Sequence, residues 1–207
     1  MFWKEIHHFD QLLTLKINSC NSSLTDPIWQ YFSNIPVWIP MYVLIVAMLI
    51  WRLGWKRGLV MALAAVATFG FCDQFSNLIK NLVCRVRPLN DAFMLTSGLN
   101  VLEGPTGSYS FFSAHAANAF GLAVSSTLGI RMDQRWFIKT GSSKTTRPVC
   151  WGEVYTAWIF FWAVMVSISR VFVGKHYLGD VIVGIIIGSL AGYIFARLAH
   201  IFCRRIR

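Results

Sequence analysis

Three segments of this sequence combine basic residues with histidine, serine or aspartate at spacings that suit phosphate chemistry. They are Lys80–Pro88 (KNLVCRVRP), Ser110–Asn118 (SFFSAHAAN) and Ser169–Asp180 (SRVFVGKHYLGD). Cationic side chains hold phosphate oxygens, and a histidine can attack phosphorus or move a proton. The three segments therefore indicate a site that binds a phosphate group and transfers it. The candidate side chains are Lys80, Arg87, Ser113, His115, Arg170, His176 and Asp180.

The first segment contains a lysine and an arginine seven residues apart. A continuing helix would place Lys80 and Arg87 on one face, two turns apart. Pro88 is expected to end that helix, because the residue before a proline avoids the helical conformation. Lysine gives a mobile point charge and arginine a fixed fork, and both suit phosphate oxygens. A basic helix end anchored among lipid headgroups has the same composition, so this segment alone favours neither interpretation.

The second segment opens an apolar helix. Ser113 can cap that helix, and the free backbone N–H groups of a helix N-terminus form a ready anion site. His115 would lie beside the anion. A lone histidine at a membrane interface is more often structural, but a second histidine on the same face weakens that interpretation.

The third segment is the most specific. His176 and Asp180 are four residues apart, which places them on one face at the start of a helix. The carboxylate can then accept from one ring nitrogen and leave the other free to attack. Arg170 is expected to face the same cavity across a tight turn that contains Gly174. The structural alternative is a histidine–aspartate hydrogen bond that caps the helix.

Composition indicates the elements that must position these residues. Of the 207 residues, 56% are apolar and 15% are aromatic, which favours a polytopic membrane protein in a single domain. A spanning helix needs roughly 20 mostly apolar residues. We predict an all-α membrane helix bundle over residues 35–207, with about five transmembrane helices. The qualifying stretches are Ile35–Trp51, Gly58–Ile79, Phe111–Ile130, Val154–Phe172 and Val181–Phe202.

Residues 1–34 have a different pattern, in which apolar residues recur at helical spacing between polar ones. We predict an interfacial amphipathic helix, then a turn at residues 18–23 and a short segment around Trp29. Charged residues interrupt the apolar run, which argues against a partial span and against a cleavable signal peptide. The apolar positions are Phe2, Trp3, Ile6, Phe9, Leu12, Leu13 and Ile17.

The net charge of +10 gathers at helix ends, where it sets topology and meets lipid phosphates. The sequence offers no exposed basic face, so nucleic acid is not expected as a partner. Threading five spans puts all the candidate site residues on one side of the membrane. The other side has the larger basic excess, so the positive-inside rule makes it cytoplasmic and turns the site toward a periplasm. That side carries Arg52, Lys56, Arg57, Arg131, Arg135, Lys139, Lys144, Arg147 and the basic C-terminus.

Four further charged residues border the motifs. Arg85 and Lys175 border the site, where they could steer anionic headgroups, but they are interpreted as solvated charges. Asp73 is expected two turns from Lys80 on the same helix face, where a structural role is favoured over substrate contact. Glu103 lies in the segment 89–110, which is compatible with a lid over the pocket and equally with a plain connector.

In their order and spacing, the segments resemble the motifs of the type 2 phosphatidic acid phosphatase family of membrane lipid phosphatases. KNLVCRVRP fits K-x6-R-P, SAHA stands in the place of S-G-H-x, and SRVFVGKHYLGD fits S-R-x5-H-x3-D, over about residues 73–192. Two positions depart from the family pattern. Phe112 replaces the usual proline, and Ala114 replaces a glycine whose backbone N–H helps to hold phosphate. Ala114 keeps that N–H.

The resemblance implies a role for each residue. His176 attacks phosphorus, Asp180 orients it, and His115 protonates the leaving oxygen and then activates water. The phosphoryl oxygens are held by Lys80, Arg87, Ser113, Ala114 and Arg170. No metal or other cofactor is implied, because carboxylates that would hold Mg²⁺ are missing near the motifs and arginines supply the charge.

The predicted function is a metal-independent phosphatase that removes a terminal phosphate from a membrane lipid, a monoester or a diphosphate, on the outer side of a bacterial inner membrane. The alternative is a phosphotransferase that passes phosphate from a polyprenyl diphosphate to a lipid acceptor. A scaffold or transporter is disfavoured because every catalytic position is filled, and a haloperoxidase is disfavoured by the membrane spans.

The sequence does not name the lipid or the oligomeric state. The compact chain and its SAHAAN segment look like small phosphatases of the Bacteroides type, some of which trim lipid A. The favoured substrates are a lipid A phosphate and undecaprenyl diphosphate. Phosphatidylglycerophosphate and phosphatidic acid are the other candidates.

Overall fold

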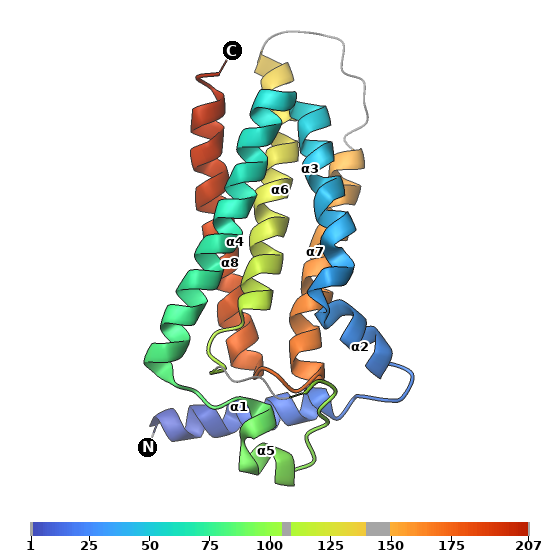
Figure 1. Cartoon of the computed structure of the whole chain (residues 1–207), viewed down its shortest axis with the longest axis vertical. Coiled ribbons are helices and arrows are strands. Elements are labelled where there is room, and N and C mark those ends of the chain that lie inside the picture. Colours follow the sequence, from blue (N-terminus) through green and yellow to red (C-terminus); the bar gives the residue numbers. More distant parts are fainter. Residues whose placement is uncertain (1, 105–108, 140–149, 207) are drawn as a thin grey trace.

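A computed structural model describes residues 2–104, 109–139 and 150–206. Within these ranges the regular elements are all helices, which confirms the all-α prediction (Figure 1). They are α1 (Phe2–Asn18), α2 (Asp26–Ser33), the 3-10 helix η1 (Ile35–Trp38), α3 (Ile39–Leu53), α4 (Trp55–Val83), the 3-10 helix η2 (Pro88–Asn90), α5 (Ala92–Thr96), α6 (Ala114–Lys139), α7 (Cys150–Phe172) and α8 (Leu178–Cys203). The basic loop at 140–149 lies outside the described residues.

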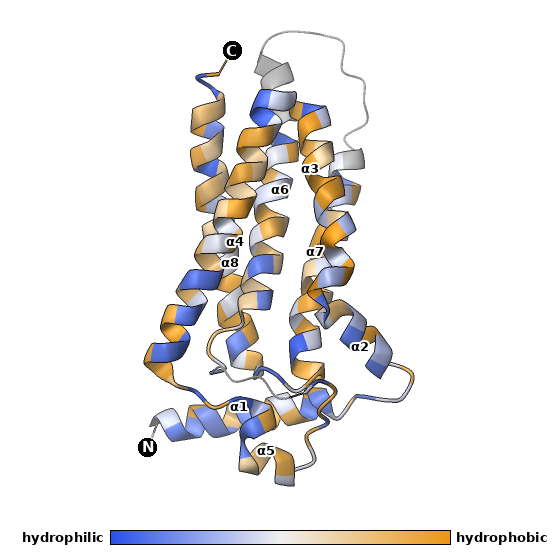
Figure 2. Ribbon diagram, viewed as in Figure 1, coloured by the Kyte–Doolittle hydropathy of each residue, from blue (hydrophilic) through white to orange (hydrophobic). Residues whose placement is uncertain are grey.

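The long helices α3, α4, α6, α7 and α8 run side by side, and α1, α2 and α5 gather at one end of the bundle (Figure 1). Apolar residues follow the long helices, while hydrophilic ones are frequent on α1 and α2 (Figure 2). Among the described residues, four stretches are long and apolar enough to cross a membrane: Ile35–Leu53, Trp55–Thr96, which includes α4, Gly152–Phe172 and Leu178–Cys203. The molecule is a polytopic membrane helix bundle.

The remaining expected span, Phe111–Ile130, falls largely in α6. This segment is helical but is not among those four stretches. Helix α6 packs against α3, α4, α7 and α8 and so occupies the centre of the bundle. Because neighbouring helices cover it, α6 can bury small polar residues such as Ser125 and Ser126. The Tyr155 hydroxyl of α7 donates to Ser126 Oγ at 2.7 Å.

Small residues bring α6 and α8 into close contact. Three glycines, Gly184, Gly188 and Gly192, recur every four residues along α8, and a Cβ at each would overlap the backbone of α6 or of the residue just before it. Such seams let two membrane helices approach backbone to backbone. The seam fixes the N-terminal end of α6, which carries His115, against that of α8, which carries Asp180. Gly184, Gly188 and Gly192 oppose Ser113, Ala117 and Gly121, respectively.

Two helix ends differ from the prediction. Helix α4 ends at Val83, Cys84 takes a left-handed φ of 51°, and Arg87 is extended. The prediction that Lys80 and Arg87 share one helix face is therefore wrong. Pro88 does exclude the helical conformation from Arg87, as expected, but the helix already stops four residues earlier. Similarly, α8 begins at Leu178, so His176 precedes the helix rather than lying on its face.

Helix α1 is amphipathic, as predicted. Trp3, Ile6 and Phe9 are exposed, whereas Thr14 and Asn18 are buried. The polar face thus packs on the protein and the apolar face points outward, as an interfacial helix requires. Its position at a membrane interface remains a proposal. The short segment expected around Trp29 is α2, where that indole stacks on Phe172 with ring centroids 4.0 Å apart.

Candidate active site

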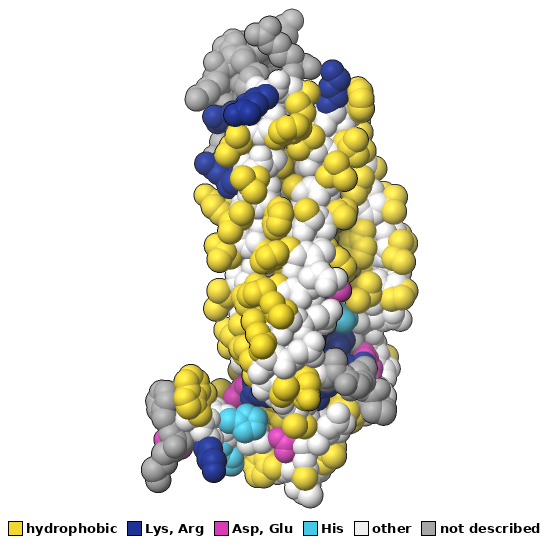
Figure 3. Space-filling view, turned by 60° about the vertical axis from the view of Figure 1, so that its left-hand side comes forward, with side chains coloured by type: hydrophobic (Ala, Val, Ile, Leu, Met, Phe, Trp, Pro, Cys, Tyr) yellow, Lys and Arg dark blue, Asp and Glu magenta, His cyan; other side chains and the backbone are white. Residues whose placement is uncertain are grey.

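At the end of the bundle near α1 lies a pocket of about 580 Å³. Figure 3 shows acidic, basic and histidine side chains in a hollow between apolar surfaces. Six of the predicted site residues line this pocket: Lys80, Arg87, Ala114, His115, Arg170 and His176. The other lining residues are Gln30, Ser33, Asn34, Ile35, Pro36, Asp73, Glu103 and Lys175.

The basic side chains of the pocket are buried. Lys80, Arg87 and Arg170 are 7%, 5% and 3% exposed, respectively. Arg87 Nη1 donates to the Lys175 carbonyl at 3.2 Å, and Arg170 Nη1 donates to Ser33 Oγ. The Nε of Arg170 has no hydrogen-bond partner in the part of the chain that the structure describes. Burying several cations side by side is unfavourable, and an anion in the pocket offsets that cost.

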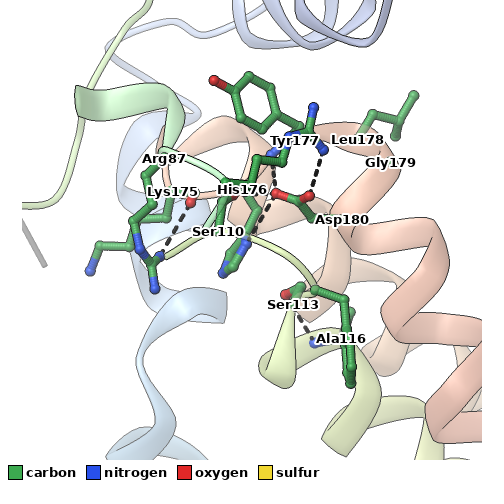
Figure 4. Close-up of polar contacts among 12 residues, drawn as sticks. Arg87, Ser110, Ser113, Ala116, Lys175, His176, Tyr177, Leu178, Gly179 and Asp180 are labelled. Carbon is green, nitrogen blue, oxygen red and sulfur yellow. Dashed lines mark hydrogen bonds and ion pairs between the residues drawn. The ribbon is translucent and has the colours of Figure 1, made fainter. Parts of the chain in front are cut away.

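His176 forms the back of the pocket, with Asp180 behind it (Figure 4). Its Nδ1 lies 3.6 Å from Asp180 Oδ2, so Nε2 is the ring nitrogen left for chemistry. Asp180 is fully buried, and its Oδ2 accepts from Ser110 Oγ and from the Tyr177 N–H at 3.1 Å. Burial lowers the pKa of His176 to about 4, and Asp180 offsets only part of this effect. The imidazole is therefore neutral, and nucleophilic, at pH 7.

A tight turn joins α7 to α8, as the sequence predicts. Gly174 has a φ of 79°, and a Cβ there would lie 3.1 Å from the Asn100 carbonyl oxygen. The backbone N–H groups of Lys175 and His176 both donate to the Arg170 carbonyl at 3.1 Å. This turn folds His176 back beside Arg170, so both face one pocket.

The second motif segment, Ser110–Asn118, contributes to the site in two ways. His115 and Ala114 line the pocket at the start of α6. Ser113 caps that helix, because its Oγ accepts from the Ala116 N–H at 3.4 Å. Its own N–H donates to the Asp180 carbonyl at 3.0 Å, and its buried side chain does not line the pocket. The predicted contact of Ser113 with phosphate stays a prediction.

The interpretation of Lys175 as a solvated charge is wrong. Its side chain is largely buried and forms an ion pair with Glu103, which lies 4.0 Å from Arg170 Nη1. Burial raises the pKa of Glu103, but hydrogen bonds from Lys175 and Ser33 and the charge of Arg170 together bring it below its ordinary value. The segment 89–110 thus places a carboxylate in the pocket, and Asp73 lines it from α4. No spacing rule links Glu103 to Lys175, 72 positions later in the printed sequence.

Arg85 is not a solvated charge either. Its Nη1 lies 2.6 Å from Asp180 Oδ1, and its Nη2 lies 2.7 Å from Asp10 Oδ2. Both partners are far from Arg85 in the sequence, so no spacing pattern predicts these contacts. Among the described residues, no group of three or more His, Cys, Asp or Glu side chains is placed to hold a metal ion.

A helical membrane bundle with buried cations around a carboxylate-backed histidine is the architecture of a membrane-embedded phosphatase. The chain belongs to the PAP2 superfamily, whose family model matches residues 55–202. It is a membrane lipid phosphatase of that family, which confirms the resemblance seen in the three motifs.

Curated relatives extend over nearly the whole chain. The chain is 31% identical over 200 residues to a lipid A 4′-phosphatase of Bacteroides thetaiotaomicron, which covers 96% of this chain and 80% of that protein. It is 24% identical over 193 residues to a lipid A 4′-phosphatase of Porphyromonas gingivalis, covering 93% and 73%, respectively.

Two crystal structures share the fold. One is a transmembrane PAP2-type phosphatidylglycerolphosphate phosphatase from Bacillus subtilis, with a TM-score of 0.70 and 19% identity over 98% of this chain and 88% of that one. The other is LpxE of Aquifex aeolicus, with a TM-score of 0.58 and 21% identity over 89% and 93%, respectively.

Proposed function

We propose that the protein hydrolyses a phosphate group of lipid A through a phosphohistidine intermediate, on the periplasmic side of a bacterial inner membrane. One observation carries the proposal: three buried cations and a neutral histidine backed by a carboxylate converge on one pocket. The cations bind the phosphate and the histidine supplies a nucleophile.

In the first step, His176 Nε2 attacks phosphorus and the bond between phosphorus and the lipid oxygen breaks. His115 gives its proton to that oxygen, which leaves as an alcohol. The carboxylate of Asp180, whose Oδ2 lies 3.6 Å from His176 Nδ1, stabilises the positive charge that develops on the ring. Lys80, Arg87 and Arg170 stabilise the charge on the phosphoryl oxygens.

In the second step, water attacks the phosphohistidine. His115 takes a proton from the water as the bond between phosphorus and nitrogen breaks, so phosphate leaves and both histidines return to their starting states. The phosphate-binding groups named above serve both steps. Since the three cations already offset a dianion, we expect EDTA to leave the rate within about twofold of the untreated enzyme.

The substrate class rests on the two relatives named lipid A 4′-phosphatase, which cover more than nine-tenths of this chain. Undecaprenyl diphosphate is the next candidate, because a diphosphate presents the same terminal phosphoryl group. The deciding experiment incubates the purified protein in detergent with lipid A, undecaprenyl diphosphate, phosphatidylglycerophosphate and phosphatidic acid, without an acceptor, and measures free phosphate.

Release of phosphate chiefly from lipid A supports the proposal, and His176→Ala serves as the blank. Preference for another lipid overturns the substrate. If no free phosphate is released, and the lipid loses its phosphate only when a lipid acceptor that receives the phosphoryl group is added, the protein is the phosphotransferase instead.

The orientation has its own test. Single cysteines replace Ser97, at the end of α5, and Arg205, after α8, in a cysteine-free background. We expect an impermeant thiol reagent to label position 97 in intact spheroplasts and position 205 only after lysis. The reverse pattern would place the site in the cytoplasm and overturn the periplasmic assignment.

A further inference from the structure

The N-terminal helix reaches the catalytic histidine through a chain of charged contacts that lies outside the three motifs. Asp10 on α1 binds Arg85 at 2.7 Å, and Arg85 binds the Asp180 carboxylate at 2.6 Å. Asp180 in turn lies behind His176 (Figure 4). We propose that Arg85 is a positioning residue for the phosphatase reaction and that Asp10 holds it in place.

Arg85 sets which oxygen of Asp180 serves the histidine. Its Nη1 engages Oδ1, while Oδ2 is the oxygen that faces His176 Nδ1. Ser110 Oγ and the Tyr177 N–H hold Oδ2 from the other directions. A carboxylate fixed at both oxygens cannot rotate, so the imidazole that it supports keeps one orientation.

Arg85 also balances charge without entering the pocket. Asp180 is a fully buried carboxylate, and an uncompensated charge there would attract the nearby lining cations Lys80 and Arg87. Arg85 lies behind the histidine and is not a lining residue, and its guanidinium carbon packs 3.9 Å from the centre of the Tyr177 ring. Because Arg85 compensates Asp180, the cations that line the pocket remain available to bind the phosphate.

Helix α1 anchors this arrangement on the first turn of α8. The Gly179 N–H donates to Asp10 Oδ1 at 2.9 Å, and the Leu178 N–H donates to Thr14 Oγ1 at 3.0 Å. These are helix N-terminal N–H groups, which have no partner within their own helix. One carboxylate, Asp10, thus fixes both the backbone just before Asp180 and the arginine that binds it.

The end of α1 is tied to the same loops. Asn18 Nδ2 donates to the carbonyls of Asn100, Val171 and Phe172 at 3.0–3.1 Å, and Asn18 Oδ1 accepts from the Asn100 N–H at 2.7 Å. An apparently peripheral helix therefore forms part of the frame around the catalytic residues.

This inference rests on the proposed function, and its test compares Arg85→Met, Arg85→Lys, Asp10→Asn and the pair Arg85→Met/Asp10→Asn. The matched control is Gln11→Leu, since Gln11 lies on the same buried face of α1 and donates to Asp91 rather than to the Arg85 chain. Each variant is assayed for kcat and KM, and its thermal unfolding is followed in detergent.

We expect Arg85→Met to lower kcat about 10- to 100-fold with KM changed less than about threefold, because a misplaced nucleophile slows chemistry rather than binding. Arg85→Lys keeps the charge, loses the fork and falls between Arg85→Met and the wild type. Asp10→Asn loses less than Arg85→Met and adds little in the pair, since both act through one contact. Gln11→Leu stays within about twofold of the wild type.

An unchanged kcat in Arg85→Met, a loss confined to KM, or losses that multiply in the pair would overturn the inference. If Arg85→Met does not accumulate as folded protein, Arg85→Lys and Asp10→Asn carry the test. If the wild type cleaves none of the four lipids, the proposed substrate is wrong, and the same comparison with p-nitrophenyl phosphate still decides the role of Arg85.

Discussion

The bundle buries opposite kinds of side chain at the site and away from it. Away from the site, the helices enclose apolar residues such as Leu49, Met61 and Ile159, each at most 1% exposed. Around the pocket the buried residues include three cations and the His176–Asp180 pair. Packing in the first region stabilises the fold, whereas the desolvation of charge in the second region destabilises it.

This contrast separates what holds the fold from what performs the chemistry. Buried cations add little to folding stability unless something compensates them, so their gathering on one pocket indicates selection for an anionic substrate. Substitutions near the pocket should change turnover, whereas substitutions in the apolar region should change stability.

The largest effect is expected for the nucleophile. His176→Ala should lower kcat at least about 10³-fold while the protein still folds, because no other group supplies the attacking atom. The matched control is His200→Ala, at the far end of α8, which should stay within about twofold. More than about a hundredth of the wild-type activity in His176→Ala would remove the assignment.

A smaller loss is expected for a phosphate-binding cation. Arg170→Met should lower kcat/KM about 10²- to 10³-fold, since Arg170 Nε has no partner among the described residues and the guanidinium helps to stabilise the transition state. Arg57→Met is the control away from the site, where Arg57 Nη2 donates to the Ile206 carbonyl at 3.3 Å. Equal losses in the two variants would show that the effect is structural.

The apolar region should respond in the opposite way. Ile159→Ala removes a fully buried side chain from the core and should lower the free energy of unfolding by about 2–4 kcal/mol. Activity per folded molecule should remain near that of the wild type. Unfolding in detergent and kcat on the folded fraction check both parts, and a kcat loss with unchanged stability would break the comparison.

The mildest effect concerns pH. Burial holds the pKa of His176 near 4, below its ordinary value of 6.5, so the free enzyme keeps a neutral nucleophile until the pH falls toward 4. The acid limb of kcat/KM should therefore lie near pH 4, and the basic limb is set by the proton donor His115. An acid limb at about pH 6.5 would contradict the buried environment of His176.

The same shift affects stability. Between pH 6.5 and 4 the unfolded histidine takes up a proton and the folded one does not, so His176 contributes a loss of stability as the pH falls through that window.

The sequence predicts the elements better than the contacts between them. Apolar runs locate the long helices, and the spacing of the third motif brings His176 and Asp180 together. The spacing succeeds for a different local reason, because His176 belongs to the turn before α8 and not to the helix. Likewise, Lys80 and Arg87 meet in the pocket although α4 ends between them.

What the sequence does not reveal are pairs formed by the folded chain. Arg85 looks like one more surface charge until α1 brings Asp10 to it, and Glu103 gives no sign of its contact with Lys175. Such pairs depend on how loops and helices pack against one another, and the periodicity of the sequence does not predict that packing. The sequence indicates that α1 has a polar face, but it does not indicate that this face contacts α8.

The central claim is that phosphate passes through His176, and the stereochemical course at phosphorus tests it most directly. The substrate is a lipid phosphorothioate made chiral with ¹⁶O and ¹⁸O, hydrolysed in water enriched in ¹⁷O. Two successive in-line displacements, first by His176 and then by water, predict net retention of configuration in the released thiophosphate. Net inversion would show that water attacks the lipid phosphate directly, and would contradict the account.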